Sequence, residues 1–206
     1  MPRITLVTLL AVVLFFPTLA SAAQITASYD VNLNSDDPGL VVNSADIADN
    51  PFTFNLGEGE SQYFSLFKIW TNESDVGDDD EVAYPISVDF NFTSPDVLFG
   101  SIDGETVGVN KVGGLFQKGV LTWDGPLDLF FGAQGDGHLR VTLFDAVFNE
   151  GYLFGLHEGK KYGAKVKAKI ELIAKVSQVP EPGTLALLGL GLLGMGLRAR
   201  RGVSTS

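Results

Sequence analysis

The sequence predicts an all-β fold, a single β-sandwich or jelly roll. Apolar and polar residues alternate with a period of two along many short segments, which is the pattern of half-buried strands. Turn residues separate these segments at intervals of about ten residues, as in sandwiches and jelly rolls. No amphipathic helical pattern appears in residues 23–178. These observations do not determine the order of the strands.

The elements follow from this alternation. It is clearest in residues 25–33, 86–93 and 164–176, where one face is apolar and the other polar. Further candidate strands are Phe52–Leu56, 63–71, Leu127–Phe131 and 139–144. Glycine, proline and aspartate predict turns between strands, because they favour the backbone angles that turns require, at residues 37–39, 57–59, 103–104, 113–114, 124–126 and 158–159.

The N-terminus predicts export. Arg3 precedes an apolar stretch, residues 4–16, and Ala20-Ser21-Ala22 has the small-x-small form of a signal-peptidase site. We therefore expect residues 1–22 to be a signal peptide that is cleaved after Ala22. The alternative is an uncleaved membrane anchor, for which the apolar stretch is short.

The C-terminus has three consecutive parts. An extended segment contains Pro180, Glu181 and Pro182, an apolar run occupies residues 184–197, and a basic cluster follows with Arg198, Arg200 and Arg201. The prolines keep their segment extended, and the arginines favour the cytoplasmic side of a membrane. The apolar run is shorter than the roughly 20 residues of a full span, so we expect a short, marginal transmembrane helix. Residues 202–206 form a final tail.

This ending, residues 179–201, resembles the PEP-CTERM sorting signal of Gram-negative bacteria that make exopolysaccharide. The resemblance implies that an exosortase, a membrane transpeptidase-like enzyme, recognises and processes the Pro-Glu-Pro segment. It also implies export, transient anchoring in the inner membrane by the C-terminal helix, and delivery to the cell surface or the extracellular matrix.

Residues 23–178 are long enough for one domain and strongly acidic. Of the chain's 14 basic and 25 acidic residues, only four arginines and Glu181 lie outside this segment, so its net charge is −14. Nucleic acid is therefore not expected as a partner, because phosphate binding needs a basic surface. The chain has no cysteine, which excludes disulfides, thiol catalysis and thiolate metal sites.

An acidic loop follows the candidate strand at residues 63–71. It is a candidate Ca²⁺ site, because a hard cation with oxygen ligands would relieve the repulsion between its crowded carboxylates. The predicted ligands are Asp75, Asp78, Asp79, Asp80 and Glu81. The alternative is a solvated acidic loop, and the spacing does not match an EF-hand.

Two features suggest sugar binding. Trp123, beside a turn, and Trp70 could stack on the apolar face of a sugar ring, as could Tyr63, Tyr84 and Tyr152; the alternative for each is core packing. On one face of the last strand lie four lysines, Lys165, Lys167, Lys169 and Lys175. They form a cationic stripe suited to anionic polysaccharide; alternatively, they protect an exposed sheet edge or face against aggregation.

We therefore expect an exported, non-catalytic surface or matrix protein that binds polysaccharide or acts in adhesion, with no catalytic residues. One alternative is a glycan hydrolase, which needs two carboxylates flanking a cleft; Asp89 and Asp128 lie on strands but are not otherwise marked. Another alternative is a structural surface protein without a ligand.

Overall fold

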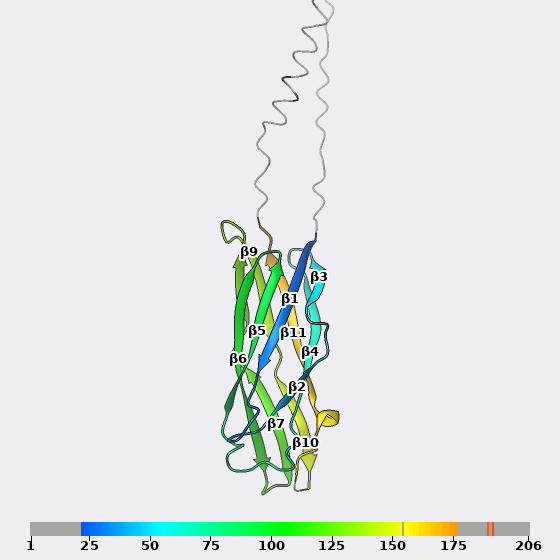
Figure 1. The fold of residues 1–206 in the computed structure, drawn as a ribbon, viewed down its shortest axis with the longest axis vertical. Coiled ribbons are helices and arrows are strands. Elements are labelled where there is room, and N and C mark those ends of the chain that lie inside the picture. Colours follow the sequence, from blue (N-terminus) through cyan, green and yellow to red (C-terminus); the bar gives the residue numbers. More distant parts are fainter. Residues whose placement is uncertain (1–21, 154, 177–188, 190, 192–206) are drawn as a thin grey trace, which may run out of the picture.

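The computed structural model describes residues 22–153, 155–176, 189 and 191. Its strands form two antiparallel sheets that lie face to face (Figure 1). In spatial order, the six-stranded sheet contains β10 (Ala146–Tyr152), β7 (Phe116–Trp123), β6 (Leu98–Lys111), β5 (Tyr84–Ser94), β1 (Ala23–Asn32) and β3 (Phe52–Leu56). The five-stranded sheet contains β2 (Asn43–Asp46), β4 (Ser61–Trp70), β11 (Ala164–Ala174), β9 (Gly137–Leu143) and β8 (Leu127–Phe131). The all-β prediction is confirmed.

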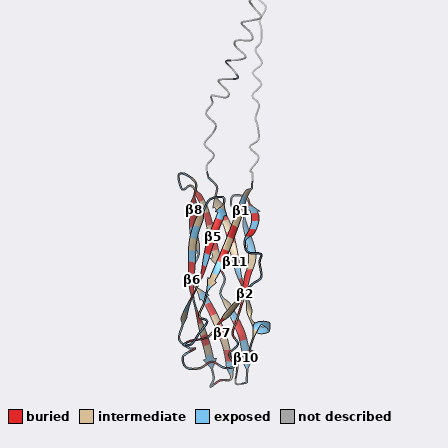
Figure 2. Ribbon diagram, viewed as in Figure 1, coloured by how far each residue is buried: buried red, intermediate tan, exposed pale blue. Residues whose placement is uncertain are grey.

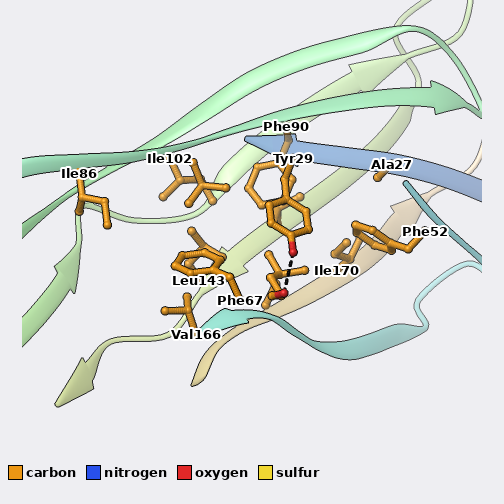
Figure 3. Close-up of a cluster of buried hydrophobic side chains, with 14 of the residues drawn as sticks. Ala27, Tyr29, Phe52, Phe67, Ile86, Phe90, Ile102, Leu143, Val166 and Ile170 are labelled. Atoms are coloured by element: carbon orange, nitrogen blue, oxygen red, sulfur yellow. Dashed lines mark hydrogen bonds between the residues drawn. The ribbon is translucent and has the colours of Figure 1, made fainter. Parts of the chain in front are cut away.

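The core lies between the two sheets and consists of the inward-facing residue of each alternating pair. On β5, Ile86, Val88, Phe90 and Phe92 are buried while the residues between them are not (Figure 2). Buried Tyr29 also has its polar atom satisfied, because its hydroxyl donates a hydrogen bond of 2.6 Å to the Leu66 carbonyl (dashed in Figure 3).

All buried core residues lie between Ile25 and Leu172. Within the described residues, the segment 23–178 therefore contains the whole core and every strand of both sheets, and we expect it to fold without the tail. The start of β1 and the end of β11 lie at one end of the sandwich, and the β6–β7 turn and the end of β10 lie at the other (Figure 1).

All seven predicted strands are present. The predicted bounds of β3 and β8 match those of the structure, and β1, β4, β5, β9 and β11 overlap their predicted segments. Four strands were not predicted: β2, β6, β7 and β10. Of the predicted signal peptide only Ala22, and of the predicted apolar helix only Gly189 and Gly191, are among the described residues.

A glycine inside a strand explains one wrong turn prediction. The predicted turn at residues 103–104 is wrong, because both residues lie inside β6. Gly104 is paired with Trp123, and a Cβ atom at Gly104 would lie 2.7 Å from the Trp123 ring. Gly119 on β7 makes room for the Phe148 ring in the same way. In this sheet glycine permits close packing within a strand and does not end the strand.

Candidate functional site

The two sheets carry different charges on their strands. The five-stranded sheet has five basic residues, Lys68, Arg140, Lys165, Lys167 and Lys169, and three acidic ones, Asp46, Asp128 and Glu171. The six-stranded sheet has two basic residues, Lys111 and Lys118, and five acidic ones, Asp30, Asp89, Asp103, Glu105 and Glu150. One sheet of a strongly acidic domain thus has a net positive charge.

The lysines of β11 lie in the middle of this basic sheet. Lys165 and Lys167 are exposed and alternate with buried Val166 and Ala168, as the sequence predicts. The lysines do not protect a sheet edge, because β11 lies between β4 and β9, whereas protection of an exposed sheet face stays an alternative. The lysines therefore occupy the outer face of a central strand, where the strands on both sides can add to the same surface.

Lys169 differs from its neighbours on the strand. Its Nζ lies 2.7 Å from the Glu171 carboxylate, and this interaction raises the pKa of Lys169. Lys165 and Lys167 form no ion pair with a carboxylate among the described residues, and they lie about 6.8 Å apart along the strand. Lys175 lies beyond the end of β11 and is half-buried. The two lysines at the start of β11 are thus the better placed to meet an anionic ligand.

Two aromatic rings lie over β11 beside these lysines. Tyr63 comes from β4, where it pairs with Lys169, and Phe144 follows directly after β9. Their ring centroids are 6.1 Å apart with an interplanar angle of 26°, and the side chains are 63% and 40% exposed. Two nearly parallel, exposed rings form an apolar platform on the basic face.

The platform belongs to a groove of about 500 Å³. Lys165 and Lys167 line this groove together with Tyr63, Phe144 and Asp145. The groove forms where the chain leaves the five-stranded sheet: the Phe144 amide still donates a 3.0 Å hydrogen bond to the Lys167 carbonyl, and the chain then crosses to β10 in the other sheet. Exposed aromatic surface and unpaired cations are therefore combined in one concave site.

A second polar cluster extends the same face on β8 and β9. Asp128 accepts hydrogen bonds from Arg140 Nε at 2.8 Å and Arg140 Nη2 at 3.0 Å, and it lies 2.7 Å from His138 Nε2. These hydrogen bonds, from Arg140 above all and then from His138, lower the pKa of Asp128 to about 2. Exposed Phe130 stacks on His138 with a centroid distance of 4.5 Å.

The predicted tryptophans do not join the groove. Trp70 is half-buried at the end of β4, and Lys160 Nζ lies 5.3 Å from its ring centroid, so a cation already covers one face. Trp123 belongs to the other sheet and packs against the core. The platform instead uses Tyr63, one of several aromatic candidates in the sequence, and Phe144, the last residue of the predicted strand at residues 139–144. Their meeting depends on which strands flank β11.

The acidic loop, between β4 and β5, lies at the end of the sandwich opposite the start of β1 and the end of β11 (Figure 1). Of its predicted ligands, Asp75, Asp79 and Asp80 line a depression, while Asp78 and Glu81 are exposed and do not. Asp37, from the loop after β1, and Glu73 are the other two acidic residues that line it. Within the part of the chain that the structure describes, no group of three acidic, histidine or cysteine side chains is arranged to hold a metal. Calcium binding therefore stays a prediction from the sequence.

Two carboxyl groups of this depression are shifted toward the protonated form. Burial raises the pKa of Glu73 to about 7, and the negative charges of Asp80 and Asp37 add to the shift, while the hydrogen bond from the Val41 amide opposes it. Burial also raises the pKa of Asp80, whose carboxylate accepts a 2.7 Å hydrogen bond from the Gly77 amide. The protonation of Glu73 and Asp80 therefore makes the charge of the acidic loop depend on pH.

The carboxylates considered for hydrolysis are not brought together. Asp89 is on β5 in the six-stranded sheet, where Asn32 donates a 2.8 Å hydrogen bond to it. Asp128 is on β8 in the other sheet and is held by Arg140 and His138. Because each lies on the outer face of a different sheet, they do not flank one cleft.

Comparison with known proteins settles the nature of the C-terminus. Residues 178–201 match the family model of the PEP-CTERM protein-sorting motif. The chain carries a PEP-CTERM sorting signal. This motif indicates an exported protein that is sorted by an exosortase, a membrane enzyme. The predicted sorting residues all lie inside the match: Pro180, Glu181, Pro182, Arg198, Arg200 and Arg201.

Those sorting residues, like Ala20 of the predicted cleavage site, lie outside the described residues. No helix among the residues that the structure describes is long and apolar enough to cross a membrane. No curated protein and no solved structure matches the chain.

Proposed function

We propose that the exported domain binds acidic polysaccharide at the cell surface or in the extracellular matrix, without catalysing a reaction on it. The observation that supports this most directly is the groove on the five-stranded sheet, where the Tyr63–Phe144 platform lies beside Lys165 and Lys167. A sugar ring presents apolar C–H patches that stack on aromatic faces, and the carboxylate of a uronic acid pairs with a lysine.

Charge makes the site selective. Because the domain has a net charge of −14, an anionic polymer is repelled except where basic side chains gather on the surface, as they do in this groove. Binding is therefore local to such places and sensitive to salt, since the Debye length is only about 8 Å at physiological ionic strength. The PEP-CTERM signal supports the location, because the resemblance places such proteins in bacteria that make exopolysaccharide.

A glycan array on residues 23–178 tests this proposal. We expect retention on polyuronates such as alginate and no retention on neutral glucans, with the signal lost at roughly half-molar salt. The double variant Tyr63→Ala/Phe144→Ala should lose most of the signal while its melting temperature stays close to that of the parent. Unchanged retention by this variant, or the absence of any polyuronate signal from the parent, would overturn the proposal.

Sorting is tested separately by the mass of the mature protein. The exosortase processes a membrane-held precursor, so we expect surface-located protein from the native host to end near Pro182. Intact-mass spectrometry of this material checks the prediction, and a precursor with all six sorting residues replaced by alanine serves as control. Surface protein that retains Arg200 and Arg201 would contradict processing.

A further inference from the structure

A second aromatic pair lies on the outer face of the six-stranded sheet. Phe116 on β7 and Tyr152 on β10 are directly paired across the two strands, and their rings meet edge to face at 5.4 Å with an interplanar angle of 87°. Both side chains are largely exposed, at 43% and 56%. They lie at the end of the sandwich opposite the start of β1 and the end of β11 (Figure 1).

This pair lines a pocket of about 290 Å³. Lys111 and Lys118, the two basic residues on the strands of the six-stranded sheet, both line it, with Val109 and Glu150. Lys111 on β6 pairs with Phe116 on β7, and Val109, two residues earlier on β6, pairs with Lys118. An otherwise acidic sheet thus places its cations beside its exposed aromatic pair.

The pocket repeats the chemistry of the groove on the opposite sheet. Each site combines one tyrosine, one phenylalanine, two lysines and a single carboxylate, which is Asp145 in the groove and Glu150 in the pocket. The two sets share no residue: the groove is lined from β4, β11, the connection after β9 and the start of β10, and the pocket is lined from β6, β7 and the end of β10. One ligand chemistry therefore fits both sites.

We infer that the Phe116–Tyr152 pocket is a second site for acidic polysaccharide, and that the domain is bivalent and cross-links polymer chains. The inference rests on the proposed function of the groove. The pocket is at the lower limit of ligand-site volumes, about 300 Å³, so it takes a single sugar unit or a chain end, whereas the groove takes a longer stretch. Two separate sites engage two chains at once, which raises avidity without any new contact.

The lining favours a glycan over another protein surface. Val112 and Leu153 beside the pocket are exposed and apolar, which would suit a protein contact. However, an apolar partner would leave Lys111, Lys118 and Glu150 without water or a partner, whereas a sugar acid offers a carboxylate to the lysines and hydroxyl groups to the glutamate.

The test uses a short ligand to count the binding sites and a long ligand to detect cross-linking. A tetramer of uronic acid is titrated calorimetrically into residues 23–178, and light scattering is followed when the domain is added to long-chain alginate. We expect two tetramers per domain and a rise in scattering for the parent. Phe116→Ala/Tyr152→Ala should bind one tetramer and cause no rise, and so should Tyr63→Ala/Phe144→Ala. Phe99→Ala, an equally exposed ring on β6 that lines neither site, should behave like the parent.

The outcomes separate the two proposals. If Phe116→Ala/Tyr152→Ala still binds two tetramers and cross-links alginate, the second site is wrong while the groove stands. If Tyr63→Ala/Phe144→Ala binds as many tetramers as the parent, the proposed function of the groove is wrong. Sedimentation velocity without ligand tests whether a second copy of the domain occupies the pocket instead. If the parent is a dimer and Phe116→Ala/Tyr152→Ala is a monomer, the pocket is a contact between copies and the inference is overturned.

Discussion

The two sheets share one core but differ in what they present to solvent. The inward residues of both sheets are buried and apolar, such as Phe90 on β5 and Ile170 on β11. Outward residues differ in charge, since the six-stranded sheet is acidic and the five-stranded sheet is basic. The alternation of a strand explains this freedom, because the outward residues can change without disturbing packing. The core thus determines the fold, and the outer faces carry the proposed ligand sites.

The largest expected effect comes from the core. Phe90→Ala removes a ring that is 2% exposed and leaves a cavity between the sheets, so it should lower the free energy of unfolding by about 3–5 kcal/mol. The matched change Phe99→Ala removes a ring that is 68% exposed and should stay within about 0.5 kcal/mol. Urea unfolding measures both; equal losses would mean that the outer face also supports the fold.

Charge reversal on the basic face should act on binding and leave the fold intact. Lys165→Glu/Lys167→Glu should weaken binding to alginate at least tenfold at low salt, which corresponds to about 1.4 kcal/mol. Lys160→Glu/Lys161→Glu, in the 3₁₀ helix Lys160–Tyr162, makes the same change in net charge outside the groove. If the two variants lose affinity equally, net charge and not the groove determines binding.

The acidic loop should make stability depend on pH. The pKa of Glu73 is about 7 in the folded protein against an ordinary value of 4.5, so the folded state holds an extra proton between these values. Stability from this group is complete below pH 4.5, falls as pH rises toward 7, and is constant above. The melting temperature should therefore be lower at pH 8 than at pH 5.5.

Glu73→Gln removes the titration but keeps an acceptor for the Val41 amide. This variant should show a flatter dependence on pH and a higher melting temperature than the parent at pH 8. Glu105→Gln, an exposed change on β6, is the control and should keep the parent's dependence. A parent whose melting temperature does not fall between pH 5.5 and 8 would contradict the effect of burial on Glu73.

The smallest expected effect is that of calcium. If the sequence prediction holds, millimolar Ca²⁺ raises the melting temperature at pH 8, by about 0.4 kcal/mol of stability when the Ca²⁺ concentration equals Kd. EDTA should reverse the shift, and Asp79→Asn/Asp80→Asn should abolish it. A melting curve that is indifferent to Ca²⁺ and EDTA would mean that the loop is solvated charge.

What the sequence predicted correctly was local. The alternation of residues 164–176 identified which side chains of β11 face the core, because a strand turns successive side chains to opposite sides whatever its neighbours are. The sorting signal was also readable, because Pro180 to Arg201 form one continuous motif. Gly104 on β6 misled the prediction, since a glycine that ends a strand and one that admits a ring from the next strand look the same in sequence.

The sites were decided by pairing over long distances in the chain. Residues 63 and 144 meet because β4 and β9 flank β11, and Asp37 lies near Glu73 because two loops end side by side. Alternation determines which face a residue occupies, but the order of strands depends on contacts between segments far apart in sequence, so it cannot be read from any one of them. By itself the sequence determined the fold class, the inward and outward faces and the sorting signal. Only the tertiary structure decided which outward residues lie together.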